Sequence, residues 1–183
     1  MVRTLTLAHL FDPGAVAVLT LLGGDPLRSF YQREVARLTG VSVGKVNRLL
    51  RTMEQNELAV KEERGRTHLY RYNLENPLAR YIKIVKSLAD LNWLVLALRK
   101  RAEKAVLFGS CADGSDTNTS DIDVFIVTRD KGQVSRMLAS AAQKMKRRIT
   151  PIVMTPGEAA TLKSRDTALS EQVQRGIRLW QRS

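Results

Sequence analysis

Two short groups of small and acidic residues lie close together in the second half of the chain. Gly109 and Ser110 follow the apolar run 105–108, and Asp121 and Asp123 open the strand-like run 121–127. On a strand, residues i and i+2 point to the same face, so both carboxylates project together. Two converging carboxylates are suitable ligands for Mg²⁺ or Mn²⁺, with waters and phosphate oxygens as the other ligands.

The glycine and serine add a site for the phosphates. Gly109 lets the backbone approach a polyphosphate closely, and Ser110 with the following amides, at a helix start, can hold phosphate oxygens. The sequence therefore predicts that a metal ion and a nucleoside triphosphate meet in one cleft. The alternative interpretation is one capping aspartate and one surface aspartate at the start of a strand.

These residues carry a family resemblance. The sequences GSCADG at 109–114 and SDID at 120–123 resemble the DNA polymerase β-like nucleotidyltransferase superfamily, in particular its minimal members, with Asp121 twelve residues after Gly109 as in that family. The resemblance implies an α/β domain with a mixed sheet that transfers a nucleotidyl group from NTP with a divalent metal. It assigns catalysis and metal binding to Asp121 and Asp123, and nucleotide binding to Gly109, Ser110 and Ser120.

Two residue positions depart from the family pattern. Asp113 stands where many members have Arg or Lys, and the candidate third strand, 148–154, contains no acid. The third carboxylate acts in the family as general base or metal ligand, so its loss should weaken turnover more than nucleotide binding. Five acids are possible substitutes: Asp116, Asp130, Glu158, Asp166 and Glu171.

The elements expected around this site are the three strands 105–108, 121–127 and 148–154, with helices over 131–146 and 170–180. We take 105–183 as one domain. A basic cluster precedes the third strand, and a solvated face is a more frequent explanation for it than a phosphate site. The cluster consists of Lys144, Lys146, Arg147 and Arg148.

The first 76 residues predict three helices and a hairpin. Asp12 and Pro13 begin a helix that Gly23-Gly24 ends, a second helix fits 31–38, and Ser42 caps a third over 43–55. The run 58–72 alternates around a hairpin tip at 64–66. With EVARLTGVS at 34–42, this order resembles the winged helix-turn-helix domains of ArsR- and MarR-type transcription regulators.

The third helix predicts contact with double-stranded DNA. Val46, Leu49, Leu50 and Met53 share one arc, and basic residues occupy the opposite arc. A recognition helix of this kind enters the major groove, where Arg and Lys can donate to guanine edges or phosphates. A plain solvated face is the alternative. The predicted DNA contacts are Lys45, Asn47, Arg48, Arg51, Arg64 and Arg66.

The segment 77–104 contains no glycine and no proline after Pro77, which predicts a continuous or once-broken connecting helix. Its part 91–98 is apolar on nearly all sides, so a second domain or a partner subunit should cover it, with Trp93 in a core. A homodimer is expected, because winged helices of this type usually present two recognition helices to successive half-sites.

The composition of the chain limits the partners, metal clusters and compartments that it can have. The 183 residues include 30 Lys and Arg against 18 Asp and Glu, a net charge of +12 that attracts polyanions. One cysteine and two histidines exclude an internal disulfide and a Cys/His zinc cluster. The single cysteine favours a cytoplasmic protein. The apolar run 14–24 is too short to cross a bilayer, so we expect no membrane association.

The fold class is therefore α+β: an N-terminal winged helix-turn-helix, a connecting helix and a nucleotidyltransferase-like domain. The favoured function is a DNA-binding regulator whose second domain binds Mg-NTP with weak or no turnover. One alternative is an active nucleotidyltransferase that modifies a protein, RNA or small acceptor. Another is an antitoxin-like interaction protein with a small helical partner.

Overall fold

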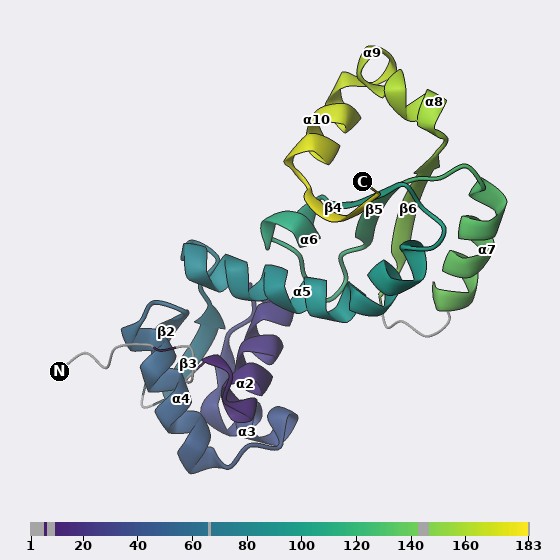
Figure 1. The fold of residues 1–183 in the computed structure, drawn as a ribbon. Coiled ribbons are helices and arrows are strands. Elements are labelled where there is room, and N and C mark those ends of the chain that lie inside the picture. The colour runs from purple at the N-terminus through teal and green to yellow at the C-terminus, as the bar shows by residue number, and fades with distance from the viewer. Residues whose placement is uncertain (1–5, 7–9, 66, 143–146, 183) are drawn as a thin grey trace. The chain divides into compact units, whose positions relative to one another are not determined.

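The computed structural model describes residues 6, 10–65, 67–142 and 147–182, with side-chain burial given for 6, 10–65, 67–140 and 147–182. The chain forms two compact units, 1–83 and 84–183. The boundary lies inside the helix α5, Pro77–Leu98, rather than at residue 76 where the sequence placed it. Figure 1 labels the helices and strands of both units.

The first unit contains the three helices expected from the sequence. Asp12 caps the first, since its Oδ1 accepts a hydrogen bond from the Ala15 amide at 3.0 Å. Gly40 ends the second with φ 71°, a left-handed conformation that suits glycine. Ser42 caps the third, as predicted. The bounds are α2, Pro13–Gly24; α3, Gln32–Thr39; and α4, Val43–Gln55.

A three-stranded antiparallel sheet completes this unit, in the order β1-β3-β2. Its strands are β1, Phe30–Tyr31; β2, Ala59–Arg64; and β3, Thr67–Tyr72. The hairpin of β2 and β3 closes with Arg64 paired to Thr67, around the tip that the sequence predicted. Val46, Leu50 and Met53 of α4 are buried in the core with Tyr70 and Tyr72 of β3. Leu38, at the end of α3, is 46% exposed although an inward position on this helix would suit an apolar residue.

The helix α5 differs from the expected 77–104 segment. It ends at Leu98, because the amides of Arg101 and Ala102 both donate to the Leu98 carbonyl at 2.8 Å and a strand begins at Lys104. In the second unit, Leu91, Leu94 and Leu98 are buried in the core. Trp93 is 39% exposed, so its assignment to a core was wrong. The homodimer stays a prediction.

The second unit contains a four-stranded sheet in the order β6-β5-β4-β7. Strands β5 and β6 are parallel and the other pairs are antiparallel, which makes the sheet mixed, as expected. The mixed α+β class is thus confirmed. The strands are β4, Lys104–Phe108; β5, Ile122–Val127; β6, Ile149–Met154; and β7, Ile177–Gln181.

The prediction of a helix over 170–180 was wrong in its second part, which forms strand β7. Only its first part is helical, and after Gly176 the chain runs antiparallel to β4. A methyl group on Gly176 would lie 2.5 Å from the Leu107 carbonyl oxygen, so this close approach of two backbones requires glycine. The hydrogen bonds of the β4 edge favour a strand over the local helical pattern.

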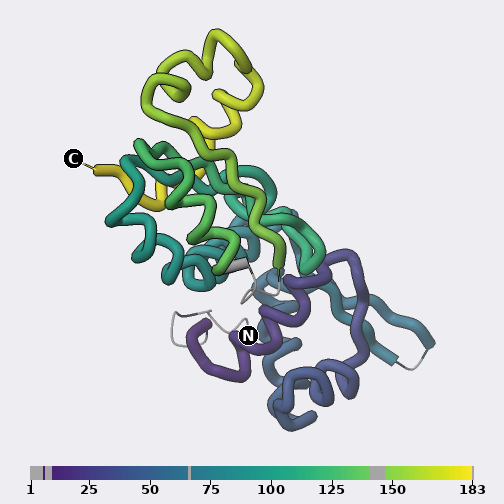
Figure 2. Tube along the Cα trace, turned by 90° about the vertical axis from the view of Figure 1, so that its right-hand side faces the viewer, coloured from purple at the N-terminus to yellow at the C-terminus, as the bar shows by residue number. Residues whose placement is uncertain are grey.

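The remaining helices flank the sheet of the second unit. Both views show the chain from α8 to α10 as an arch between β6 and β7 (Figures 1 and 2). Among the described residues, no helix combines the length and the hydropathy that a membrane crossing needs. The bounds are α6, Ser110–Asp113; α7, Lys131–Ala142; α8, Pro156–Ala160; α9, Leu162–Arg165; and α10, Thr167–Arg175.

Candidate metal and nucleotide site

Gly109 forms a sharp turn between β4 and α6. Its φ of 69° and ψ of −158° lie in a region that only glycine adopts readily. A methyl group on this residue would lie 2.6 Å from Oδ2 of Asp123. Since Phe108 also pairs with Asp123 across the sheet, the turn lies directly against this carboxylate. The short helix α6 then ends at Gly114, whose amide donates to the carbonyl of Ser110.

The carboxylate pair lies where β5 begins. Asp121 immediately precedes the strand and is exposed, whereas Asp123 is within it and half-buried. The pKa of Asp123 is raised above its usual value, first by partial burial and second by the negative charge of Asp121. The two carboxylates therefore share one end of the strand and repel each other, as the sequence pattern predicts.

Thr150 is the neighbour of the pair on the next strand. It lies opposite Asp123 in the parallel register of β5 and β6. Its hydroxyl donates a hydrogen bond to Oδ2 of Asp121 at 3.1 Å. A third acid on this strand would need this position to reach the pair, and a neutral hydroxyl occupies it instead.

The five acids that were possible substitutes all have partners elsewhere in the fold. Asp116 is buried and ion-paired with Arg147, at 2.8 Å between Oδ2 and Nη1. Asp130 and Asp166 accept hydrogen bonds from backbone amides at the starts of α7 and α10. Glu158 forms a capping box with Thr155, and Glu171 lies 3.8 Å from Arg175.

Glu158 is also at the wrong end of the sheet. It follows Met154, which pairs with Val127 at the far end of β5. A hydrogen bond from the Thr155 backbone and an ion pair with Lys131 lower the pKa of Glu158 to about 2. At about 3.3 Å per residue, the length of β5 alone separates this acid from Asp123 by more than 10 Å.

Arg147 holds the loop that leads into the pair, although the sequence favoured a solvated face for its cluster. Its side chain is only 20% exposed. Nε and Nη2 donate to the carbonyl of Ser120 at 3.0 and 2.9 Å, Nη1 donates to Asp116, and Nη2 lies 3.1 Å from Sγ of Cys111. Because Ser120 directly precedes Asp121, this guanidinium fixes the backbone beside the carboxylates.

Ser120, a predicted ligand of the nucleotide, and Asp113, a departure from the family pattern, both have contacts within the loop. The Ser120 hydroxyl accepts a hydrogen bond from the Thr117 amide at 2.9 Å, so it stabilises the loop. Asp113 accepts one from the Ser115 amide at 2.8 Å. Ser110 is half-buried at the start of α6, next to Gly109.

The donor set suits a divalent cation that also binds phosphate. Asp121 and Asp123 supply hard carboxylate oxygens, and Thr150 adds a hydroxyl beside them. Among the described residues, there is no group of three His, Cys, Asp or Glu that could hold a metal ion by itself. A metal at this position would therefore depend on waters and phosphate oxygens for most of its ligands.

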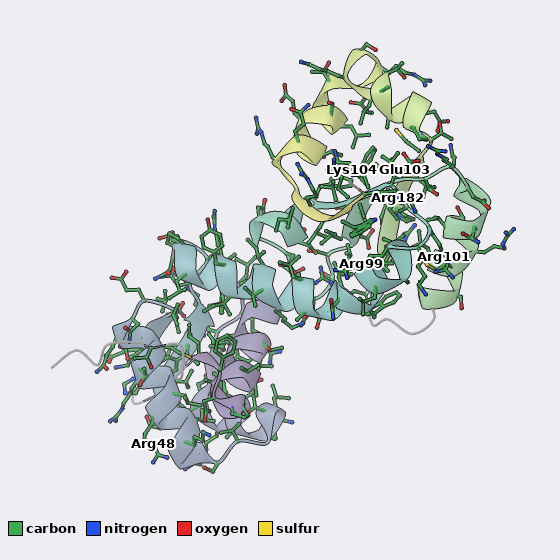
Figure 3. All side chains as sticks on the ribbon, viewed as in Figure 1. Arg48, Arg99, Arg101, Glu103, Lys104 and Arg182 are labelled. Carbon is green, nitrogen blue, oxygen red and sulfur yellow. The ribbon has the colours of Figure 1, made fainter. Side chains whose placement is uncertain are left out.

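The predicted DNA contacts all lie in the first unit. Lys45 is ion-paired with Asp12 at 2.9 Å, and Asn47 accepts a 3.4 Å hydrogen bond from Gln32. Arg48 and Arg51 are exposed on α4, and Arg48 projects outward from this helix (Figure 3). Arg64 is exposed at the hairpin tip, and Arg66 lies outside the described residues, as do Lys144 and Lys146.

Sequence reasoning missed Thr150 and Arg147 as parts of the site. Thr150 is a polar residue within an otherwise apolar strand, which was the available signal. Arg147 is the third cation of a basic run, and nothing in the local sequence distinguishes it from the other cations of that run.

A family model and one solved structure match parts of the chain. Residues 94–183 match the family model "Polymerase beta, Nucleotidyltransferase". A crystal structure of a "putative nucleotidyltransferase" from Sulfolobus solfataricus is 21% identical, with 56% of this chain and 87% of that chain covered and a TM-score of 0.35. No curated protein matches the chain. The family match spans the sheet, the glycine turn and the aspartate pair: residues 94–183 are a polymerase beta-like nucleotidyltransferase domain.

Proposed function

We propose that the protein is a DNA-binding regulator whose nucleotidyltransferase-like domain binds Mg-NTP with weak or no turnover. The observation that carries the second half is Thr150, which hydrogen-bonds Asp121 at the position a third carboxylate would need. Two acids are enough to bind a cation together with phosphate oxygens. Without a third, the site has no group suited to remove a proton from an acceptor hydroxyl.

The residues of the site have separate roles in nucleotide binding. A bound Mg²⁺ would neutralise charge on the triphosphate and on both carboxylates. Asp121 and Asp123 hold the cation, and the turn at Gly109 brings backbone close to the phosphates. Arg147 keeps Asp121 in place through the Ser120 carbonyl. Each step concerns binding and orientation, which is the activity expected of a sensor.

Calorimetry of ATP binding, with and without Mg²⁺, tests this half. We expect metal-dependent binding by the native chain and none by Asp121→Asn/Asp123→Asn, which should fold normally because it loses a carboxylate repulsion. Equal affinities for the two proteins would exclude the metal site. Incubation with α-labelled NTPs and cell extract tests turnover, and rapid transfer of label would favour the active enzyme instead.

The DNA-binding half rests on the first unit. Three helices followed by an antiparallel hairpin are the elements of a winged helix-turn-helix domain. The exposed side chains of Arg48 and Arg51 on α4, with Arg64 at the hairpin tip, support contact with a duplex. Lys45 already has Asp12 as its partner, so we assign it a smaller share of the DNA contact.

Mobility-shift titrations on selected duplex DNA test this assignment. The variant Arg48→Ala/Arg51→Ala should lose about 2–6 kcal/mol of binding free energy if both arginines read bases, with relaxed sequence preference. Arg28→Ala/Arg80→Ala is the control, since it removes two exposed arginines elsewhere in the same unit. An equal loss in both variants would reduce the interaction to general charge and contradict specific reading.

The proposal includes a homodimer on DNA. Two copies would place their α4 helices on half-sites about 34–36 Å apart. Sedimentation with and without the operator measures the oligomeric state, and footprinting measures how many half-sites are protected. A monomer that protects a single half-site would overturn the proposed homodimer and leave the rest of the proposal in place.

A further inference from the structure

A second basic surface lies in the nucleotidyltransferase-like domain, away from the aspartate pair. The run 99–104, RKRAEK, contains four cations and one acid. Two further arginines follow β5 and β7, whose ends lie on either side of the start of β4. We call these residues the basic edge: Arg99, Lys100, Arg101, Lys104, Arg129 and Arg182.

Contacts between the elements bring these cations together. Lys104 pairs with Val127 of β5 on one side and with Gln181 of β7 on the other. The Arg182 amide donates to the Glu103 carbonyl at 2.8 Å, and the Thr128 hydroxyl donates to the Arg101 carbonyl at 2.7 Å. Labelled members of the basic edge come from the end of α5, the start of β4 and the end of β7 (Figure 3).

Two acids, Glu103 and Asp130, accompany the six cations of this surface. Glu103 pairs with Arg129 at 2.6 Å, and the Arg129 side chain is 85% exposed. Within the segment 99–104, Glu103 is the one acid. The basic edge thus keeps a net positive charge, although the pairing of the strands does not require charged side chains there.

The spacing of the cations fits a phosphodiester backbone. Lys104, Arg129 and Arg182 lie at the ends of three neighbouring strands, which are about 4.8 Å apart. They therefore cover about 10 Å of the sheet end. Phosphates of one nucleic-acid strand follow each other at about 3.4 Å along the helix axis, so this width corresponds to about three such intervals, or about four phosphates.

An arginine–tryptophan contact favours nucleic acid over a membrane. The Arg99 guanidinium lies 5.4 Å from the ring centre of Trp180, and the indole nitrogen donates to the Ala102 carbonyl at 3.1 Å. Trp180 is half-buried and packs against the core, so it does not protrude as an interfacial anchor. Four of the six cations are arginines, whose planar guanidinium matches phosphate oxygens in pairs.

We propose that the basic edge binds the phosphate backbone of a nucleic acid, independently of α4. Lys104 begins the strand whose other end, Phe108, pairs with Asp123. About 14 Å of strand separates these two ends. A polynucleotide on the basic edge is therefore distinct from a nucleotide at the aspartate pair, and the surface recognises charge and spacing rather than base sequence.

Titration of a labelled oligonucleotide of about 20 residues, as single-stranded DNA and as RNA, tests the proposal. All proteins carry Arg48→Ala/Arg51→Ala, which removes the arginines of α4. In this background, Lys100→Gln/Lys104→Gln/Arg182→Gln should lower affinity at least tenfold. The slope of log K against log salt should fall by about 2, as expected for three lost phosphate contacts on a single strand.

A matched control and an opposite change sharpen the result. Arg136→Gln/Lys163→Gln/Arg165→Gln removes the same charge from exposed positions of the same domain and should change affinity less than threefold. Glu103→Gln frees Arg129 and should strengthen binding severalfold. A preference between DNA and RNA identifies the natural partner, and either preference supports the proposal.

Three results would overturn it. Equal losses in the two triple variants would mean that only net charge matters. Competition by polyglutamate as effective as that by the oligonucleotide, at equal charge, would indicate an acidic protein surface. Binding to vesicles that contain phosphatidylserine, without binding to either oligonucleotide, would indicate a membrane.

Discussion

The two ends of the four-stranded sheet carry opposite charge arrangements. Where β5 begins, Asp121 and Asp123 lie together, and the pKa of Asp123 rises through burial and the neighbouring negative charge. At the other end, Glu103 is paired with Arg129 and Glu158 with Lys131. Acids at the far end stabilise the fold through cations and backbone amides. The acids at the near end oppose each other, an arrangement suited to a bound cation.

The environments of Asp123 and Glu158 shift the pKa values of these two carboxyls in opposite directions. Backbone hydrogen bonds and an ion pair lower the pKa of a carboxylate that caps a helix, as at Glu158. A carboxylate held beside another one, with its pKa raised, costs stability that only a ligand offsets. The carboxylates of the site are therefore Asp121 and Asp123, and Thr150 is their neighbour through its hydrogen bond to Asp121.

Removal of Arg147 should have the largest effect on the near end. Arg147→Met leaves Asp116 buried without its ion pair and frees the Ser120 carbonyl. We expect a loss of about 2–4 kcal/mol of unfolding free energy, somewhat below the cost of breaking a fully buried pair. Urea denaturation measures it. Arg147→Lys keeps the charge but not the planar fork, so it should recover part of the stability and less of the metal-dependent ATP affinity. Equal recovery of both would make the role purely structural.

Gly109→Ala should have the second-largest effect on stability. The backbone conformation at this turn and the 2.6 Å approach to Asp123 both exclude a side chain. A cost of about 1–3 kcal/mol is expected, together with loss of Mg²⁺-dependent ATP binding. Gly157→Ala is the control, because nothing lies within 4 Å of its added carbon. Binding at native affinity in Gly109→Ala would show that the phosphates do not need this turn.

The sequence was sufficient for the local parts of the molecule. The bounds of α4 and its cap at Ser42 follow from helical spacing within one segment, and the glycine turn and aspartate pair are readable for the same reason. What failed depends on distant partners. Strand β7 exists because the β4 edge offers hydrogen bonds 70 residues upstream. Arg147 is held by Asp116, and Thr150 meets Asp121 only through parallel pairing.

Thr150→Asp should strengthen the metal site. A third carboxylate beside the pair adds a ligand when the metal is bound. When a chelator has removed the metal, it adds a further negative charge that repels the pair. We expect Mn²⁺ affinity to rise about tenfold, or about 1.4 kcal/mol, and the melting temperature without metal to fall. Thr150→Asn, similar in size but neutral, should do neither. A rise in both variants, or in neither, would contradict the placement of Thr150 at the missing acid.

The pH dependence of Asp123 gives a smaller and more direct test. Its raised pKa means that the folded protein keeps this proton longer than the unfolded chain, so ionisation on raising the pH lowers stability. Carbon-detected NMR should find a titration midpoint above the usual value of 3.8, and Asp121→Asn should move it down. A midpoint unchanged by Asp121→Asn would separate the two carboxylates and remove the basis for a shared cation.

The smallest effect belongs to Glu158, at the opposite end of the sheet. Its pKa of about 2 lies below the usual 4.5, so its contribution to stability is fully present above pH 4.5 and disappears as the pH falls through about 2. Glu158→Gln should therefore lower the melting temperature slightly at neutral pH and progressively less as the pH falls through about 2, where the native side chain becomes protonated. The ion pair with Lys131 is exposed, which keeps the change small and sensitive to salt. Metal-dependent ATP affinity should stay at the native value, since more than 10 Å of strand separates Glu158 from Asp123. A loss of that affinity in Glu158→Gln would mean that a third acid does reach the site, and the division of the sheet into a structural and a functional end would then be wrong.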